Sequence, residues 1–247
     1  MSNENSVAFG VDFFTADKSS LLSDIEKRIY APYSFVVTPN VDHLVQLNKN
    51  HEFRDAYCKA SIRICDSRVL SPLLRSLGVI IQEVIPGSDL TLDLLSWANR
   101  DRLRLVLIGG SELEVERLRL LYPGIFLYHH NPPMGFIERV SEVDECLNFI
   151  RDHHSEIVLY AVGAPRQEIL ASYIEPNERT GVGFCIGASI SFATGTIKRA
   201  PKWMQKAKLE WLHRMVSDPR RLVKRYFNDF LFIVVAYCSE KLKSRKL

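Results

Sequence analysis

Short, β-branched apolar runs alternate along this chain with longer amphipathic segments, and this alternation constrains the fold more than any other feature. The runs SFVVT at 34–38, LRLVLIGG at 103–110 and GVGFCIG at 181–187 are typical of buried strands. Stretches with apolar residues spaced three and four apart lie between such runs, which is typical of helices packed on one face. Strand, helix, strand, helix in succession predicts a Rossmann-like α/β fold, a parallel sheet with helices on both faces.

The remaining segments fit the same pattern. We expect further strands in SIRIC at 61–65, IFLYHH at 125–130 and EIVLYAVG at 156–163. One helix should follow Asn40, which suits an N-cap, and another should end at Gly78. The segment 87–100 should form a helix with a Ser or Asp cap, and 111–124 and 164–174 should form two more, the latter with Pro165 in its first turn.

The pattern changes near Thr196, where helical segments rich in Lys, Arg and Trp replace the alternation. We therefore expect an α/β body over 1–197 and a basic helical appendage over 198–247. The appendage carries 14 Lys and Arg against 4 Asp and Glu, whereas the body carries 18 against 25. An acidic body with a strongly basic tail indicates an anionic partner for the tail.

The basic run at 198–226, with its two tryptophans, is compatible with nucleic acid, a membrane surface or a phosphorylated small molecule. The apolar run FLFIVVAYC at 230–238 is too short to span a membrane, so it is a core strand, a buried helix or an interfacial patch. The five cysteines show no CxxC spacing and the N-terminus lacks the pattern of a signal peptide. These features predict a cytoplasmic protein with reduced thiols.

Unusual residues stand where four of the predicted strands end. In parallel sheets ligands bind beyond the carboxyl ends of the strands, where glycines and helix N-termini let backbone amides approach phosphate. The competing interpretation is that turns need glycine and helices need caps, with Asp66 capping a helix that starts at Ser67. The residues concerned are Thr38, Asn40, Asp66, Gly109, Gly110 and the segment 162–168.

Several site types are absent from the sequence. There is no GxGxxG or GxxxxGK[ST] motif, no DxD sequence and no cluster with metal-ligand spacing. The adjacent pairs His129–His130 and His153–His154 point apart on any regular element, and we expect them to be exposed to solvent. We therefore expect neither a metal nor a cofactor, and any bound nucleotide should be neutralised by Arg, Lys and helix ends.

Five motifs together resemble the WecG/TagA/CpsF family of bacterial glycosyltransferases, glycosyltransferase family 26. They are TPNVDHLVQL, PGSDL, LIGG, GAPRQE and the long block GTIKRAPKWMQKAKLEWLHRMVSDPRRLVKRY. The resemblance runs from about Val36 to Tyr226. It implies an inverting, metal-independent transfer of sugar from a UDP-sugar to a polyprenyl-diphosphate-linked saccharide at the cytoplasmic face of the membrane. Products of such enzymes enter wall teichoic acid, common antigen or exopolysaccharide.

The resemblance also implies roles for individual residues. Asp66 corresponds to the proposed general base, and Thr38 and Asn40 to the polar pair of the first motif. Arg214 falls among the arginines expected to clasp the diphosphate, where Arg220 and Lys224 are alternatives in register. The residues expected to contact substrate are Gly109, Gly110, Gly163, Ala164, Pro165, Gln167, Glu168, Arg199, Arg221 and Arg225.

The chain departs from the family pattern in three places. It reads DSRVL where Asp-Gly-x-Gly is usual, Ser191 stands where Asp is common, and MGF replaces Gly-Tyr-Phe. The first departure favours UDP-glucose as donor, extending a lipid-linked hexose in exopolysaccharide synthesis, with UDP-N-acetylmannosamine or its uronic acid as the alternative. Expected partners are the two substrates, an anionic membrane surface and a second copy of the chain.

Two other classes compete with the transferase. A nucleic-acid-binding module would use the basic tail, but it assigns no function to Asp66 and sets an acidic body beside a polyanion. A nucleotide-dependent oxidoreductase lacks its glycine fingerprint. The transferase is therefore the preferred hypothesis, without nucleic acid as a partner.

Overall fold

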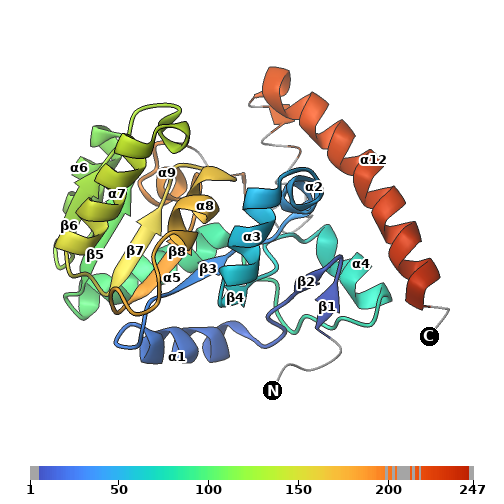
Figure 1. Ribbon diagram of the computed structural model, residues 1–247, viewed down its shortest axis with the longest axis horizontal. Coiled ribbons are helices and arrows are strands. Elements are labelled where there is room, and N and C mark those ends of the chain that lie inside the picture. The colour runs from blue at the N-terminus through green and yellow to red at the C-terminus, as the bar shows by residue number, and fades with distance from the viewer. Residues whose placement is uncertain are drawn as a thin grey trace.

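The computed structural model describes residues 6–197 and 218–244, together with the single residues 200, 201, 204, 212, 215 and 216. Its centre is a six-stranded sheet in the order β4-β3-β8-β7-β5-β6, in which every pairing is parallel (Figure 1). The expected parallel α/β sheet is thereby confirmed. Its strands are β3 (Ser34–Val37), β4 (Ile62–Arg63), β5 (Arg104–Ile108), β6 (Phe126–His130), β7 (Ile157–Tyr160) and β8 (Val182–Cys185).

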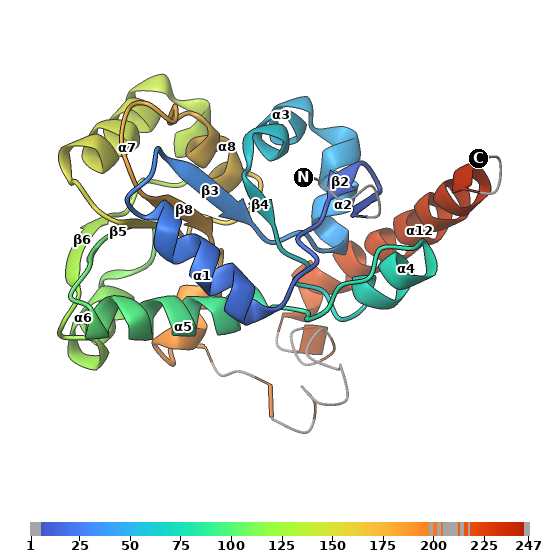
Figure 2. The same cartoon turned by 90° about the horizontal axis from the view of Figure 1, so that it is seen from below.

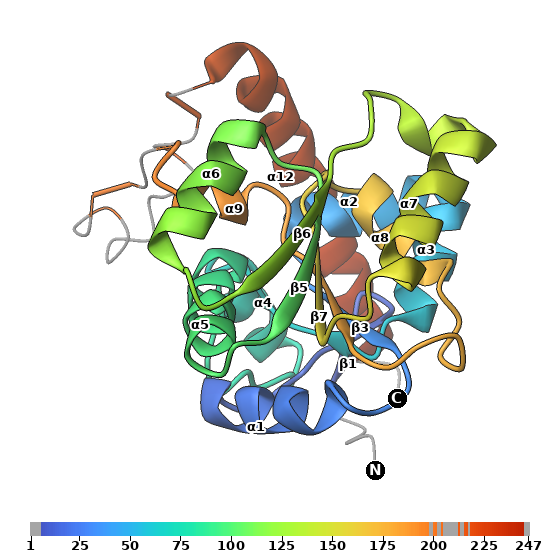
Figure 3. The same ribbon diagram turned by 90° about the vertical axis from the view of Figure 1, so that its left-hand side faces the viewer.

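Helices cover both faces of this sheet (Figure 3). Each face has its own apolar cluster. The first cluster joins the sheet to α2 (Val41–Lys49), α3 (His51–Lys59), α4 (Leu70–Ser76), α7 (Val140–Asp152) and α8 (Arg166–Ser172). The second joins it to α1 (Lys18–Arg28), α5 (Gly87–Arg100), α6 (Glu112–Leu121) and α9 (Ser189–Ala193). The hairpin β1 (Val7–Ala8) and β2 (Val11–Asp12) and the short helix η1 (Phe136–Glu138) complete the body.

The helix ends follow the capping residues, with one exception. Asn40 and Ser111 accept backbone N–H bonds at the starts of α2 and α6, and Gly78 takes a positive φ after α4. The expectation of a Ser or Asp cap for α5 is wrong. The N-cap residue is Pro86, which has no side chain that can accept a hydrogen bond from the first turn. Pro165 directly precedes α8 and does not lie in its first turn.

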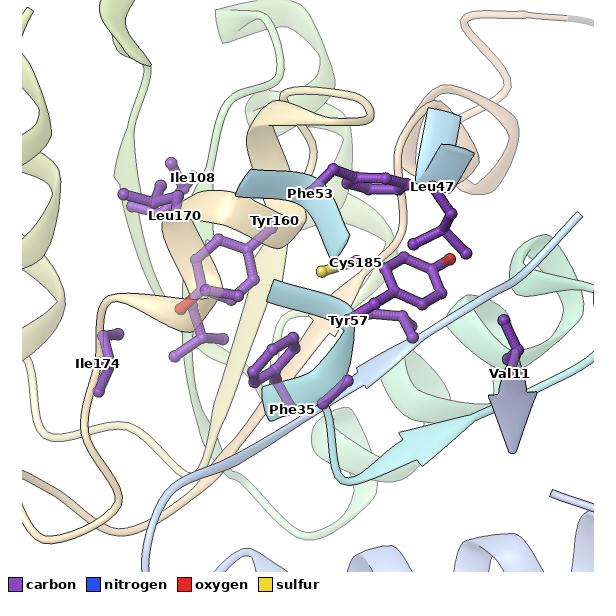
Figure 4. Close-up of a cluster of buried hydrophobic side chains, with 14 of the residues drawn as sticks. Val11, Phe35, Leu47, Phe53, Tyr57, Ile108, Tyr160, Leu170, Ile174 and Cys185 are labelled. Atoms are coloured by element: carbon purple, nitrogen blue, oxygen red, sulfur yellow. The ribbon is translucent and has the colours of Figure 1, made fainter. Parts of the chain in front are cut away.

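Gly183 shows how tightly the sheet is packed beneath α3 and α8. The hydroxyls of Tyr33 and Tyr160 lie 2.8 Å apart across β8. A Cβ atom on Gly183 would lie 2.5 Å from the Tyr33 hydroxyl and 2.8 Å from a ring carbon of Tyr160. Figure 4 shows Tyr160 in this cluster with Phe35, Tyr57 and Cys185. Glycine is therefore the residue that lets two buried tyrosines cross the strand.

The C-terminal helix α12 (Pro219–Ser244) runs past α2 and α4 (Figure 2). Leu222 and Ile233 are buried, and the Ser76 hydroxyl donates to the Tyr237 hydroxyl at 2.9 Å. The run 230–238 is thus helical, so the core-strand interpretation is wrong. Within the described residues, no helix combines the length and the apolarity needed to cross a bilayer. The division of the chain at residue 197 stays a prediction.

Candidate active site

The loops that follow β3 and β4 meet the start of α5 at the carboxyl edge of the sheet. The Asp66 amide donates to the Pro39 carbonyl at 3.2 Å, and the Gly87 amide donates to Asp66 Oδ1 at 2.8 Å. Three segments distant in sequence are therefore tied together at Asp66, by its backbone amide and by its carboxylate. This places Asp66 where α/β sheets bind their ligands.

Asp66 does not cap the helix that follows it. The Ser67 hydroxyl oxygen accepts from the Leu70 amide at 3.1 Å, so Ser67 serves the start of α4. The Asp66 carboxylate instead lies at the N-terminus of α5, where the helix dipole favours a negative charge. A half-buried carboxylate held in this way is suited to receive a proton from a neighbouring hydroxyl.

Thr38 and Asn40 flank this carboxylate on the β3 side. Thr38 is 9% exposed, whereas Asn40 Oδ1 accepts from the His43 amide at 3.1 Å and caps α2. The oxygen of Asn40 therefore has a structural function in the body. A catalytic function for either residue stays a prediction.

The segment after β7 forms a bridge to the loop after β8. Gln167 Oε1 accepts from the Gly187 amide at 2.9 Å, and Gln167 Nε2 donates to Glu168 Oε1 at 2.8 Å. Gly163 has a positive φ, and the peptide between Ala164 and Pro165 is cis. Gln167 thereby fixes the loop that leads into α9.

Glu168 is 0% exposed, which argues against its expected contact with substrate. Among the described residues, nothing hydrogen-bonds to its Oε2. Burial raises the pKa of the Glu168 carboxyl from 4.5 to about 7, and the nearby charge of Asp42 acts in the same direction. Glu168 therefore holds the Gln167 side chain in place by accepting its hydrogen bond. Near neutral pH, a substantial fraction of the protein molecules carries this carboxyl in its protonated form.

Glu168→Gln should make the protein more stable at pH 8 than the wild type, and more so than at pH 5. The raised pKa of Glu168 means that its stabilising contribution is complete below about pH 4.5 and is lost as pH rises through about 7. Glutamine stays neutral and keeps the oxygen that accepts from Gln167. We expect melting curves to show a gain of several degrees at pH 8 that shrinks toward pH 5.

The exposed residue Glu116 provides a matched control, since Glu116→Gln should change melting equally at both pH values. The pKa of Asp229 is also raised, to about 6, but this group is common to all the proteins compared. A constant difference between Glu168→Gln and wild type across this range would contradict the buried, protonated carboxyl.

The turn after β5 is built on two glycines. Gly109 and Gly110 have φ of 89° and 84°, and a Cβ on Gly109 would lie 2.8 Å from Val162 Cγ1. The next helix, α6, begins with a capping box in which the Ser111 amide donates to Glu114 Oε2 at 2.7 Å. That amide is already paired and two glutamates occupy the first turn, so this helix end is less favourable to phosphate than expected.

His129 supports the same turn from the neighbouring strand. Its Nε2 lies 3.1 Å from the Gly109 carbonyl and 3.3 Å from the Gly110 carbonyl, and only 8% of the side chain is exposed. Solvent exposure of this histidine was therefore a wrong expectation. The cause is the register of β6 beside β5, which places His129 against the glycine turn.

The arginines of the C-terminal block are only partly described. Arg199 and Arg214 lie outside the described residues, and Arg221 lies on α12. Arg225 Nε faces Asp42 Oδ1 at 3.6 Å and Asp229 Oδ2 at 4.0 Å, which joins α12 to α2 electrostatically. The alternatives in register, Arg220 and Lys224, are exposed. Contact of these residues with a diphosphate stays a prediction.

Sequence reasoning missed two residues beside Asp66. Gly87 and Ser189 lie next to Thr38, and neither residue carries a charge that would mark it as functional. Within the described part of the chain there is no group of three or more His, Cys, Asp or Glu side chains arranged to hold a metal ion.

Comparison with known proteins gives one family. The family model described as "Glycosyl transferase WecG/TagA/CpsF family" matches residues 7–247. A protein of Staphylococcus aureus strain MW2 is 25% identical over 247 residues, covering 96% of this chain and 94% of its own. A protein of Bacillus spizizenii is 24% identical over 217 residues, covering 85% and 82%.

Both relatives are named N-acetylglucosaminyldiphosphoundecaprenol N-acetyl-beta-D-mannosaminyltransferase. Their names favour N-acetylmannosamine, the alternative donor sugar of the sequence analysis, over glucose. These names do not support the preference for glucose that was drawn from the departure at DSRVL. That departure lies in a loop where the Asp66 amide donates to the Pro39 carbonyl and the Ser67 hydroxyl oxygen accepts from the Leu70 amide.

Proposed function

Because this chain belongs to the WecG/TagA/CpsF glycosyltransferase family, we propose that it transfers N-acetylmannosamine from a UDP-sugar to a polyprenyl-diphosphate-linked saccharide. The observation that supports this donor is the shared name of relatives that match nearly the whole chain. The same names support a diphosphoundecaprenol-linked N-acetylglucosamine as the acceptor.

The reaction needs one base, one nucleophile and a stabilised leaving group. Asp66 accepts the proton of the acceptor hydroxyl as that oxygen attacks the anomeric carbon. The bond between this carbon and the phosphate oxygen breaks, and UDP leaves with the bonding electrons. Attack from the face opposite the leaving group inverts the anomeric configuration. The α5 N-terminus holds Asp66 in place for this step.

The charge that develops on the departing UDP requires cations, because no metal takes part in this proposal. The basic appendage would supply them, with Arg199, Arg214, Arg221 and Arg225 as the residues proposed to contact the diphosphate. Arginine suits this function since its guanidinium binds phosphate oxygens in pairs. Gly109, Gly110 and the Gly163–Pro165 turn would form the opposite wall.

A donor screen tests the proposal. Purified protein would be incubated with a short-chain polyprenyl-diphosphate N-acetylglucosamine and with UDP-N-acetylmannosamine, its uronic acid or UDP-glucose, and products would be read by mass spectrometry. We expect an added N-acetylmannosamine. Transfer of glucose alone would overturn the donor assignment, and absence of transfer from every UDP-sugar would overturn the function.

The outer face of α12 supports a membrane-bound site of action. Between residues 223 and 235 of this helix, six large apolar side chains are between 46% and 70% exposed, and cations accompany them. We place this face on the anionic inner surface of the cell membrane as a peripheral contact, where each nearby Lys or Arg contributes about 1 kcal/mol. The apolar residues are Val223, Phe227, Phe230, Leu231, Val234 and Val235.

Replacing Phe227 and Phe230 with serine should lower binding to anionic vesicles by at least about tenfold. Each exposed phenylalanine that enters the interface contributes about 1.5–3 kcal/mol. Flotation with vesicles of phosphatidylglycerol and phosphatidylethanolamine would measure the change. Leu120→Ser is the control, since Leu120 is 80% exposed on α6 of the body. Unchanged flotation of the double variant would leave self-association as the function of this face, which light scattering would detect.

A further inference from the structure

A niche beside Asp66 is lined by Thr38, Gly87 and Ser189, from three different parts of the fold. A methyl group built on Gly87 would lie 3.5 Å from Thr38 Cγ2, 3.7 Å from Thr38 Oγ1 and 3.7 Å from Ser189 Oγ. The two hydroxyls therefore converge on the point that a side chain at residue 87 would occupy. Because Gly87 also donates its amide to Asp66 at 2.8 Å, this point adjoins the carboxylate.

The two residues are largely buried, but their hydroxyl oxygens stay open to solvent and lack protein partners. Thr38 is 9% and Ser189 is 8% exposed. Among the residues that the structure describes, none hydrogen-bonds to either hydroxyl oxygen, although the Ser189 amide donates to the Ile186 carbonyl at 3.0 Å. Two hydroxyls that lie about one point and have no protein partner are available to donate and accept hydrogen bonds with a ligand.

The loop carrying Ser189 is fixed from behind. Gln167 Oε1 accepts from the Gly187 amide, and the buried Glu168 binds the other end of the same amide group. This support presets the position of Ser189 without using its hydroxyl. A site whose backbone is held while its hydroxyls stay free is suited to substrate binding.

We propose that the Thr38–Gly87–Ser189 niche binds a ring hydroxyl of a pyranose and that Ser189 is a substrate-binding residue. The proposal rests on the proposed transferase function. A sugar hydroxyl suits the niche because it donates and accepts hydrogen bonds, as do both side-chain hydroxyls. A phosphate oxygen suits it less, because the Asp66 carboxylate lies next to it and would repel an anion.

Gly87→Ala tests the niche without removing any protein contact. The added methyl group meets its neighbours at ordinary van der Waals distances, and Gly87 does not have a positive φ. Alanine also favours helix, so the thermal midpoint should stay equal or rise. The methyl group nevertheless occupies the position of the ligand hydroxyl, and we expect one sugar substrate to show a KM raised by about tenfold or more.

Ser189→Ala should raise the KM of the same substrate by about three- to tenfold, because it removes one hydrogen bond and leaves the loop intact. Ser96→Ala is the control: the Ser96 hydroxyl bonds only within α5, to the Leu92 carbonyl. Each variant is compared with wild type for donor KM, acceptor KM and kcat, and for the affinity of UDP measured by calorimetry.

The measurements test the niche and the proposed transferase function separately. A raised donor KM would assign the niche to the transferred sugar, and a raised acceptor KM would assign it to the lipid-linked sugar. UDP has no pyranose, so its affinity should be the same in all variants. Unchanged KM values in Gly87→Ala, or a loss of UDP affinity and stability together, would overturn the niche. Failure of wild type itself to transfer any sugar would instead overturn the proposed function.

Discussion

Asp66→Asn is expected to lower turnover by about 10²- to 10⁴-fold while both substrates still bind, which is the usual contribution of a general base. Asparagine keeps the shape and the Oδ1 atom of Asp66, so the Gly87 amide retains its acceptor at the start of α5. The substitution replaces the carboxylate by a neutral amide, which cannot accept a proton from the acceptor hydroxyl. The loss should therefore appear in kcat with little change in either KM.

Two companion variants make this result specific. Asp66→Ala also removes the acceptor for Gly87, so it should lower stability by about 1 kcal/mol in addition to turnover. Asp24→Asn removes a carboxylate that pairs with Arg28 on α1 and should leave kcat unchanged. Turnover of Asp66→Asn within a few-fold of wild type would refute the assignment of Asp66 as the base.

The sheet could be predicted because hydrophobic runs and their spacing are local properties of the sequence. The strands containing Val36, Leu107, Leu159 and Phe184 are buried runs that end in Gly, Pro or Asp, and all pair in parallel. Short or polar elements were harder to predict, and the sequence analysis did not predict β1, β2 or α1. The strands β1 and β2 have two residues each, too few to show a hydrophobic pattern. Their structure depends on tertiary contacts such as the bridge between Phe14 and Ile64.

The site could be predicted only in part, since its decisive contacts are distant in sequence. Asp66 was recognised at the end of a strand, but its bond to Gly87 joins residues 21 positions apart. Ser189 carries no charge and no unusual local pattern. The burial of His129 likewise follows from strand register, which a single sequence does not specify. The residues of this candidate site are thus identified by where they lie in the sheet more than by their residue types.

The two faces of α12 explain why its composition alone was ambiguous. Ile233 and Asp229 face the body, and Arg225 lies between Asp229 and Asp42. Phe230 and Val235 face away, 64% and 70% exposed. The same helix therefore docks on the body and presents an apolar surface to solvent. Its amino-acid composition does not separate these two properties, because both faces contain apolar and charged residues. This arrangement supports a function of the appendage close to the candidate site.

Ending the chain at Ile197 is expected to reduce transfer by at least about 10³-fold while the body stays folded. All six strands of the sheet precede this position, and of the described residues beyond it Ile233 is the one buried member of the two apolar clusters. The deletion also removes 14 Lys and Arg, including every arginine proposed to stabilise the leaving UDP. Loss of a single such donor commonly costs 10²- to 10³-fold.

The measurement is transfer to a short-chain, water-soluble acceptor, so that loss of membrane binding does not contribute. Circular dichroism and a cooperative melt would show that the body is folded, and Arg225→Ala in the full chain provides a second variant if the truncated protein is not. Arg225→Ala removes the contact with Asp42 and one candidate phosphate ligand, and we expect a loss of about 10- to 100-fold. Full activity of a folded truncated chain would confine catalysis to the body, and would assign the cations of α12 to the membrane alone.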